Sequence, residues 1–361
     1  MIRDSAVGLR FGRSWLSGRA DVEAVEVELD RGDRVVPATL YRRAGRSRPG
    51  GWIALHGATI PGRFHPQLVR FARTVAHTGT AVLVPEVPEW AALRVAPGLT
   101  LPTVRAALPV LRARAGGRIG LMGFSFGAPQ AIVAAADPTL RGELAGVAAF
   151  GGYCALAPTL RFLFLGEHEW EGRRYRSPVD PYGRWIVGAN YLARAPGHED
   201  AGDVAAALHA LAADAGMRRV PAWDPVYDAR KRELAEGIAP ERRPLFETFA
   251  PPADRPPDRA AAERVIQVLL AAVHTSEPLM DPAERLREVR VPVRVLHGRG
   301  DVLLPFTETL RMQRTLAGVT DVRATVTRLF GHTHEDDVPG LGWAWESGRF
   351  VRALGEVLRL V

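Results

Sequence analysis

The 361-residue chain is 47% hydrophobic and 24% charged, a composition typical of a globular protein, and its length fits one domain with a sizeable insertion. Its formal net charge of +7 comes from scattered arginines, with Lys231 the only lysine, so we expect no nucleic-acid binding. Cys154 is the only cysteine, which excludes an intrachain disulfide, and no stretch reads as a signal peptide or a membrane span, so we expect a cytoplasmic protein.

The first part of the chain alternates strands and helices. Alternating apolar residues over 25–29 predict a strand, the turn-forming Asp30-Arg31-Gly32-Asp33 follows, and an extended run over 35–41 completes an antiparallel hairpin. The patterns that follow predict a strand over 51–55, a helix over 66–77, a strand over 81–84, a helix over 101–115, a strand over 118–122, a helix over 126–136 and a strand over 144–150. Such alternation indicates a mostly parallel sheet with helices on both faces.

The alternation stops after residue 152. Residues 153–288 are rich in Ala, Arg, Pro and Trp and contain helical segments over 204–213 and 260–274, which predicts a mainly helical insertion. Alternation then resumes with a strand over 291–296, a helix over 306–316, a strand over 322–330 and a closing helix over 344–360. We therefore expect one α/β core built from residues 1–152 and 289–361, with residues 153–288 inserted after the sixth strand.

A Gly-x-Ser-x-Gly motif lies at the centre of this pattern. The apolar run from Arg118 ends at Gly123-Phe124-Ser125-Phe126-Gly127, and a helix of small residues follows. A sharp strand-to-helix turn there strains the backbone of Ser125, and glycines on either side remove side chains that would collide. The first N–H groups of the helix have no intrahelical partner and point toward the serine, where they can stabilise an oxyanion. The motif predicts a nucleophile elbow.

Candidate partners of Ser125 follow two later strands. A serine hydroxyl needs a general base, usually a histidine that a carboxylate orients. Asp301 lies in a Gly-rich loop after the strand over 291–296, and His332 directly follows the next strand. His334 is the alternative base, because a loop after this strand could present either histidine to the site. Considered alone, Asp301 is as well explained by capping its own turn as by a catalytic role.

With these three residue types in the order Ser, Asp, His, the chain resembles the α/β-hydrolase superfamily. The likeness covers roughly residues 20–152 and 289–361. It implies an α/β-hydrolase fold in which Ser125 is the nucleophile, His332 is the general base and then acid, and Asp301 orients the histidine.

The same resemblance implies an oxyanion hole and a cap. His56-Gly57-Ala58 is similar to the family's oxyanion loop, which would make the backbone N–H groups of Ala58 and Phe126 the two donors. Insertions after the sixth strand commonly form a cap that shapes the substrate pocket and excludes water. The candidate pocket residues are His56, Trp170, Tyr175 and Trp185. Aromatic residues of an insertion more often form the core of the cap than line its pocket.

A carboxylic ester or thioester of small size is the expected substrate, cleaved through an acyl-enzyme without a cofactor. Acyl transfer, peptide hydrolysis and C–C bond hydrolysis use the same triad and stay as alternatives. A non-catalytic receptor with this fold is an alternative from another class, although the presence of all three triad residue types argues against it. The sequence does not indicate the oligomeric state.

One rival motif overlaps the candidate base. His332-Thr333-His334-Glu335-Asp336 resembles the His-x-His-x-Asp-His zinc motif of metallo-β-lactamase-like hydrolases, but Asp337 stands where the last histidine belongs. This change removes a ligand, and a position near the C-terminus does not suit that family. We therefore expect no metal site.

Overall fold

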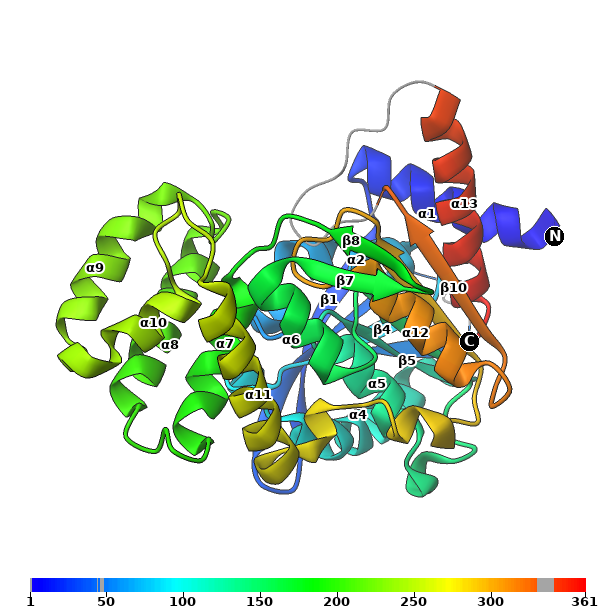
Figure 1. The fold of residues 1–361 in the computed structure, drawn as a ribbon. Helices are drawn as coiled ribbons and strands as arrows, with labels where there is room; N and C mark the ends of the chain where they lie inside the picture. Colours follow the sequence, from blue (N-terminus) through cyan, green and yellow to red (C-terminus); the bar gives the residue numbers. More distant parts are fainter. Residues whose placement is uncertain (1, 44, 46–48, 330–340) are drawn as a thin grey trace.

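The computed structural model describes the chain except residues 1, 44, 46–48 and 330–340, and the side chains of residues 2–6 and 341–344. Its centre is an eight-stranded sheet in the order β1-β2-β4-β3-β5-β6-β9-β10 (Figure 1). β2 runs antiparallel to both of its neighbours and the other pairs are parallel, so the predicted mostly parallel sheet is confirmed. The strands are β1 (Val22–Asp30), β2 (Val35–Arg43), β3 (Gly51–Leu55), β4 (Ala81–Pro85), β5 (Ile119–Phe124), β6 (Val147–Phe150), β9 (Val293–Gly298) and β10 (Val322–Thr327).

Helices cover both faces of this sheet, which explains why its central strands read as unbroken apolar runs. Successive strand residues point to opposite faces, so Trp52 and Ala54 of β3 pack in one core, while Ile53 and Leu55 pack in the other. The first core is covered by α1 (Ile2–Ser17), α2 (Pro66–His77) and α13 (Leu341–Leu358). The second is covered by α4 (Thr100–Ala115), α5 (Gly127–Ala135) and α12 (Phe306–Leu316).

The N-terminal helix α1 was not among the predicted elements. It packs against α13 at the other end of the chain, and Figure 1 shows the two helices crossing. Close approach depends on Gly8, where an added Cβ would lie 2.4 Å from the carbonyl oxygen of Val351. Charge and small residues interrupt the apolar spacing of this segment, which hid the helix from the sequence pattern.

The segment between β6 and β9 forms the insertion, residues 151–292. It is mainly helical, as predicted, but it also contains an unpredicted antiparallel pair, β7 (Glu167–Trp170) and β8 (Arg173–Arg176). Figure 1 shows α8, α9 and α10 to one side of the sheet. The helices are α6 (Leu156–Leu165), α7 (Tyr182–Tyr191), α8 (Gly202–Arg218), α9 (Asp228–Glu236), α10 (Arg243–Phe249) and α11 (Arg259–Ser276), and the short α3 (Pro88–Ala91) precedes the insertion.

Most predicted boundaries shift by a few residues, and two strands begin later than expected. The strand expected over 144–150 is only β6, because its first residues form the turn that leads into the sheet, and β9 begins at Val293 rather than at residue 291. Where the structure describes the chain, it contains no helix that combines the length and apolarity needed to cross a bilayer.

Candidate active site

Ser125 lies between β5 and α5 in the expected strained conformation. Its backbone φ angle is +53°, a value that residues other than glycine rarely adopt. The turn is fixed because the Ser125 N–H donates to the carbonyl of Phe150 (2.9 Å) and the Ser125 carbonyl accepts from the N–H of Ala128 (3.0 Å). An added Cβ at Gly123 would lie 2.0 Å from the Gly127 carbonyl oxygen, so only glycine fits there.

The loop after β3 lies against this serine. An added Cβ at Gly57 would be 3.1 Å from Cβ and 3.6 Å from Oγ of Ser125. The next residue is Ala58, and in the part of the chain that the structure describes, neither its backbone N–H nor that of Phe126 donates a hydrogen bond to another protein group. Two free donors therefore flank the elbow, as an oxyanion site requires.

His56 holds this loop in place. Its buried ring donates from Nδ1 to the carbonyl of Gly57 (2.7 Å) and accepts at Nε2 from the N–H of Val87 (3.0 Å). This pair of bonds requires the neutral ring, and burial lowers its pKa, against the opposing effect of nearby Glu86. The arrangement suits a structural residue rather than a base, although the ring does line the cavity described below, as expected for a pocket residue.

Asp301 is buried in the loop after β9. Its Oδ1 accepts from the N–H groups of Leu303 (2.8 Å) and Leu304 (2.9 Å), which is the turn-capping role considered for it above. Its Oδ2 lies 3.2 Å from Nε2 of His297. That nitrogen also lies 3.0 Å from the Leu304 carbonyl, so it is the protonated one, and Nδ1 accepts from the hydroxyl of Thr309 (2.8 Å). Asp301 is therefore held rigidly in its loop.

The two candidate bases, His332 and His334, lie outside the described residues, as do the other residues of the zinc-like motif. Over the rest of the chain, no group of three or more His, Cys, Asp or Glu side chains is arranged to hold a metal ion.

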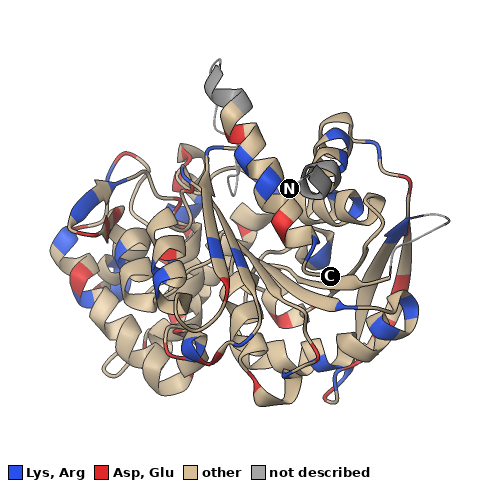
Figure 2. Cartoon of the chain, turned by 90° about the vertical axis from the view of Figure 1, so that its right-hand side faces the viewer, with Lys and Arg blue, Asp and Glu red and all other residues tan. Residues whose placement is uncertain are grey.

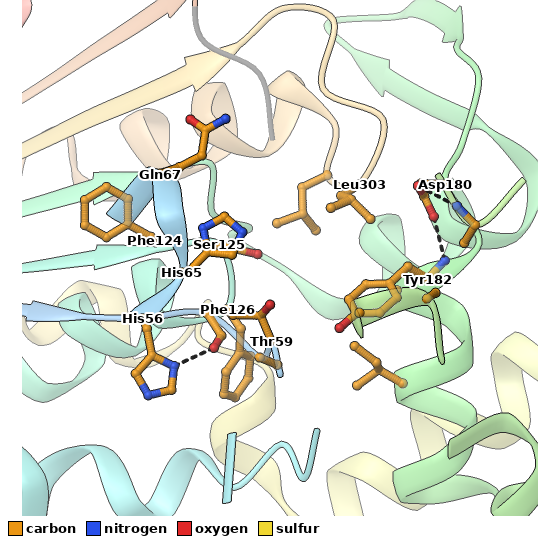
Figure 3. A pocket seen from close by; sticks show the side chains of 18 of the residues that line it. His56, Thr59, His65, Gln67, Phe124, Ser125, Phe126, Asp180, Tyr182 and Leu303 are labelled. Atoms are coloured by element: carbon orange, nitrogen blue, oxygen red, sulfur yellow. Dashed lines mark hydrogen bonds between the residues drawn. The ribbon is translucent and has the colours of Figure 1, made fainter. Parts of the chain in front are cut away.

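A cavity of about 510 Å³ opens beside Ser125. Figure 3 shows the serine between Phe124 and Gln67 on one side and Leu303 and Tyr182 on the other. Apolar side chains from both the core and the insertion form most of its wall, which suits an apolar ligand. The larger apolar side chains of this lining include Trp15, Leu68, Phe71, Val95, Phe124, Phe126, Phe150, Leu156, Leu163, Ile186, Val187, Val220, Met280, Leu303 and Leu304.

The aromatic residues expected in the pocket lie elsewhere. Trp185 is fully buried inside the insertion, where its Nε1 donates to the Phe249 carbonyl (3.0 Å). Tyr175 stacks on His168, and Trp170 packs under the guanidinium of Arg314. None of the three lines this cavity: the tryptophan fills the core of the insertion, and the other two belong to the unpredicted β7–β8 pair.

The insertion contributes residues that the sequence did not single out. Asp180 accepts from the N–H groups of Tyr182 (2.9 Å) and Ala222 (3.2 Å), which joins two walls of the cavity. Its own N–H donates to the carbonyl of Val302 (2.8 Å), next to Asp301. This aspartate therefore ties the insertion to the loop that carries the candidate acid. The sequence around it, Val179-Asp180-Pro181, matches no motif that would have predicted this role.

The sheet order, with an elbow after β5, an acid after β9 and an insertion between β6 and β9, defines the α/β-hydrolase fold. No protein-family model and no curated protein sequence matches the chain.

Solved structures resemble it at low identity. An acylaminoacyl peptidase from Pyrococcus horikoshii is 11% identical with a TM-score of 0.48, and the match covers 95% of this chain but 42% of that one. Brefeldin A esterase, a bacterial homologue of human hormone-sensitive lipase, is 18% identical with a TM-score of 0.47, covering 98% of this chain and 83% of the other. An esterase from Pyrococcus furiosus is 14% identical with a TM-score of 0.45, covering 94% and 92%. The chain thus spans less than half the length of the peptidase.

Proposed function

We propose that the chain is a serine hydrolase that cleaves a carboxylic ester or thioester. The observation that carries this proposal is the strained backbone of Ser125, with φ at +53°, beside two free N–H groups and an apolar cavity. Strain of this kind persists only where the surrounding structure enforces it, and it concentrates at functional sites. A binding protein would have no need of a strained serine next to oxyanion donors.

In the proposed reaction, Ser125 Oγ attacks the substrate carbonyl while His332 accepts the hydroxyl proton. The developing oxyanion takes hydrogen bonds from the N–H groups of Ala58 and Phe126, and each such donor is worth about a hundred- to a thousandfold in rate. His332 then protonates the leaving alcohol or thiol, and the acyl-enzyme forms. Water attacks the acyl group with His332 as base, and Asp301 stabilises the imidazolium in both steps.

The insertion serves as a cap in this proposal. Its helices α6, α7 and α8 contribute to the wall of the cavity, and the Asp180 contacts hold it against the acid loop. A cap of this kind excludes water around the developing charge, which strengthens the oxyanion hydrogen bonds. The apolar lining favours a hydrocarbon acyl or alcohol group.

Hydrolysis of short p-nitrophenyl esters tests this function. We expect turnover by the wild type, with kcat lowered at least about a thousandfold in Ser125→Ala and in His332→Gln. His334→Gln, two residues away, is the matched control and should keep most of its activity. Activity that a chelator abolishes, or that survives in Ser125→Ala, would contradict the serine mechanism.

A further inference from the structure

The solvent exposure of the lining residues shows where the cavity opens to the surface. Of the described residues that line it, only Pro66, Gln67 and Arg219 are exposed. The first two begin α2, and Arg219 directly follows α8. These two edges lie close together, because an added Cβ at Gly216 would be 2.9 Å from the side chain of Ile60, just before the loop that leads to α2. The mouth therefore lies between the start of α2 and the end of α8.

Several large apolar side chains that are close in sequence to residues of this mouth are exposed to solvent. Leu16 is 72% exposed and follows the lining residue Trp15, and Phe64 is 53% exposed and precedes His65. On the other edge, Met217 is 62% and Trp223 38% exposed. A single exposed apolar residue needs no explanation, but several around one opening mark an interaction surface.

The core side of the mouth is also strongly basic. Residues 5–20 and 57–85 contain no Asp or Glu and contain six arginines, Arg10, Arg13, Arg19, Arg63, Arg70 and Arg73. By contrast, α13 beside them carries both signs along its length (Figure 2).

Most of these arginines are not neutralised by the protein. Among the described residues, Arg10, Arg13 and Arg19 have no carboxylate within ion-pair distance. Arg70 and Arg73 donate to the backbone carbonyls of Trp15 and Ala20. Only Arg63 pairs with carboxylates, those of Glu26 and Glu86. Their charge is therefore available to an anionic partner.

Helix α1 is amphipathic in a way that fits a flat partner. Phe11 and Ser14 are buried against the core. Leu9, Arg13 and Leu16 are exposed, and their spacing of four and three residues places them on one face of the helix. Exposed leucines can enter a lipid interface while the long side chain of a neighbouring arginine reaches the phosphate groups.

We propose that the exposed face of α1, with Leu9, Leu16, Arg10, Arg13 and the adjoining Arg19, and the rim of the mouth, with Phe64, Met217 and Trp223, together bind an anionic phospholipid surface. The arginines are attracted to the phosphate layer, and the apolar side chains enter the boundary of the acyl chains. The mouth of the cavity then faces the lipid, so an apolar substrate reaches Ser125 without crossing water. The binding itself does not depend on the proposed reaction.

Cosedimentation of the full chain with vesicles tests the proposal. We expect binding to phosphatidylcholine vesicles that contain phosphatidylglycerol and weak binding to phosphatidylcholine alone. High salt should weaken the binding to the anionic vesicles and leave the weak binding to phosphatidylcholine nearly unchanged. Leu16→Ser with Phe64→Ser should lower the partition coefficient at least about tenfold. Val35→Ser is the matched control, since Val35 is 59% exposed on the β1–β2 hairpin, which lines no part of the cavity.

The electrostatic part has its own pair of variants. Arg10→Gln with Arg13→Gln should weaken binding about tenfold or more, whereas Arg232→Gln with Arg264→Gln, on α9 and α11, should leave it within a factor of two. Equal binding to both vesicle types overturns the proposal. So does an equal loss of vesicle binding in the Arg10/Arg13 and the Arg232/Arg264 double variants. So does concentration-dependent dimerisation that Phe64→Ser abolishes, because a second copy would then cover this surface. Ester turnover is measured separately, so failure of one result leaves the other standing.

Discussion

Substituting Gly127 by alanine tests the geometry of the elbow directly. An ideal Cβ at this position would lie 2.5 Å from the carbonyl oxygen of His56 and 2.9 Å from that of Leu55. Both neighbours are backbone atoms at the end of β3, so no flexible side chain can move aside. Reaching an ordinary contact of 3.4 Å requires a shift of about 0.9 Å, which is 3.4 minus 2.5.

That shift separates the two proposed oxyanion donors. The end of β3 leads to Ala58, while Gly127 follows Phe126, so the added methyl group pushes the two N–H groups apart. A displacement of about 1 Å in a catalytic arrangement costs on the order of a hundredfold in rate. Overpacking of this kind also destabilises the fold by about 1–3 kcal/mol.

The assay is ester hydrolysis at saturating substrate together with urea unfolding. We expect Gly127→Ala to lower kcat about a hundredfold while KM changes much less. Gly348→Ala is the control: this exposed position in α13 has no atom within 4 Å of the added Cβ, so it should stabilise the protein by about 0.5–1 kcal/mol and leave kcat unchanged. Unchanged kcat and stability in Gly127→Ala would mean that close packing of Gly127 against the end of β3 does not set the position of the two N–H groups.

Two further predictions concern buried titratable groups. Burial lowers the pKa of His56 below 6.5, so below that pH the folded protein binds fewer protons than the unfolded chain and loses stability as the pH falls. Between pH 6.5 and 5 the free energy of unfolding should therefore fall more steeply in the wild type than in His56→Gln, by up to about 1.4 kcal/mol per pH unit, and parallel curves would contradict this. Glu308 accepts from the N–H groups of Cys154 and Ala155 at the start of the insertion, so Glu308→Ala should cost at least about 2 kcal/mol in urea unfolding, and a loss below 0.5 kcal/mol would show that these contacts are unimportant.

The elements of the core could be predicted because their signals are local. The strand over 51–55 and the helices over 66–77 and 306–316 have the predicted bounds, since unbroken apolar runs and helical spacing reflect burial on a fixed face. The elbow was equally readable, because only glycine tolerates the contacts around Ser125.

The walls of the cavity could not be predicted in the same way. Trp185 and Tyr182 are close in sequence and both aromatic, yet the first fills the core of the insertion and the second lines the cavity. Which side a residue faces there depends on packing between irregularly placed helices, and no single period reports it. The role of Trp15 depends on α1 meeting α2, a contact between segments about 50 residues apart, and nothing local indicates it.

The central claim is that Ser125 is an activated nucleophile. Intact-mass analysis after treatment with a fluorophosphonate, followed by mapping of the modified peptide, tests it most directly. We expect one adduct, on Ser125, that is absent from Ser125→Ala. A folded protein that takes no adduct, or takes it on another residue, would contradict the claim.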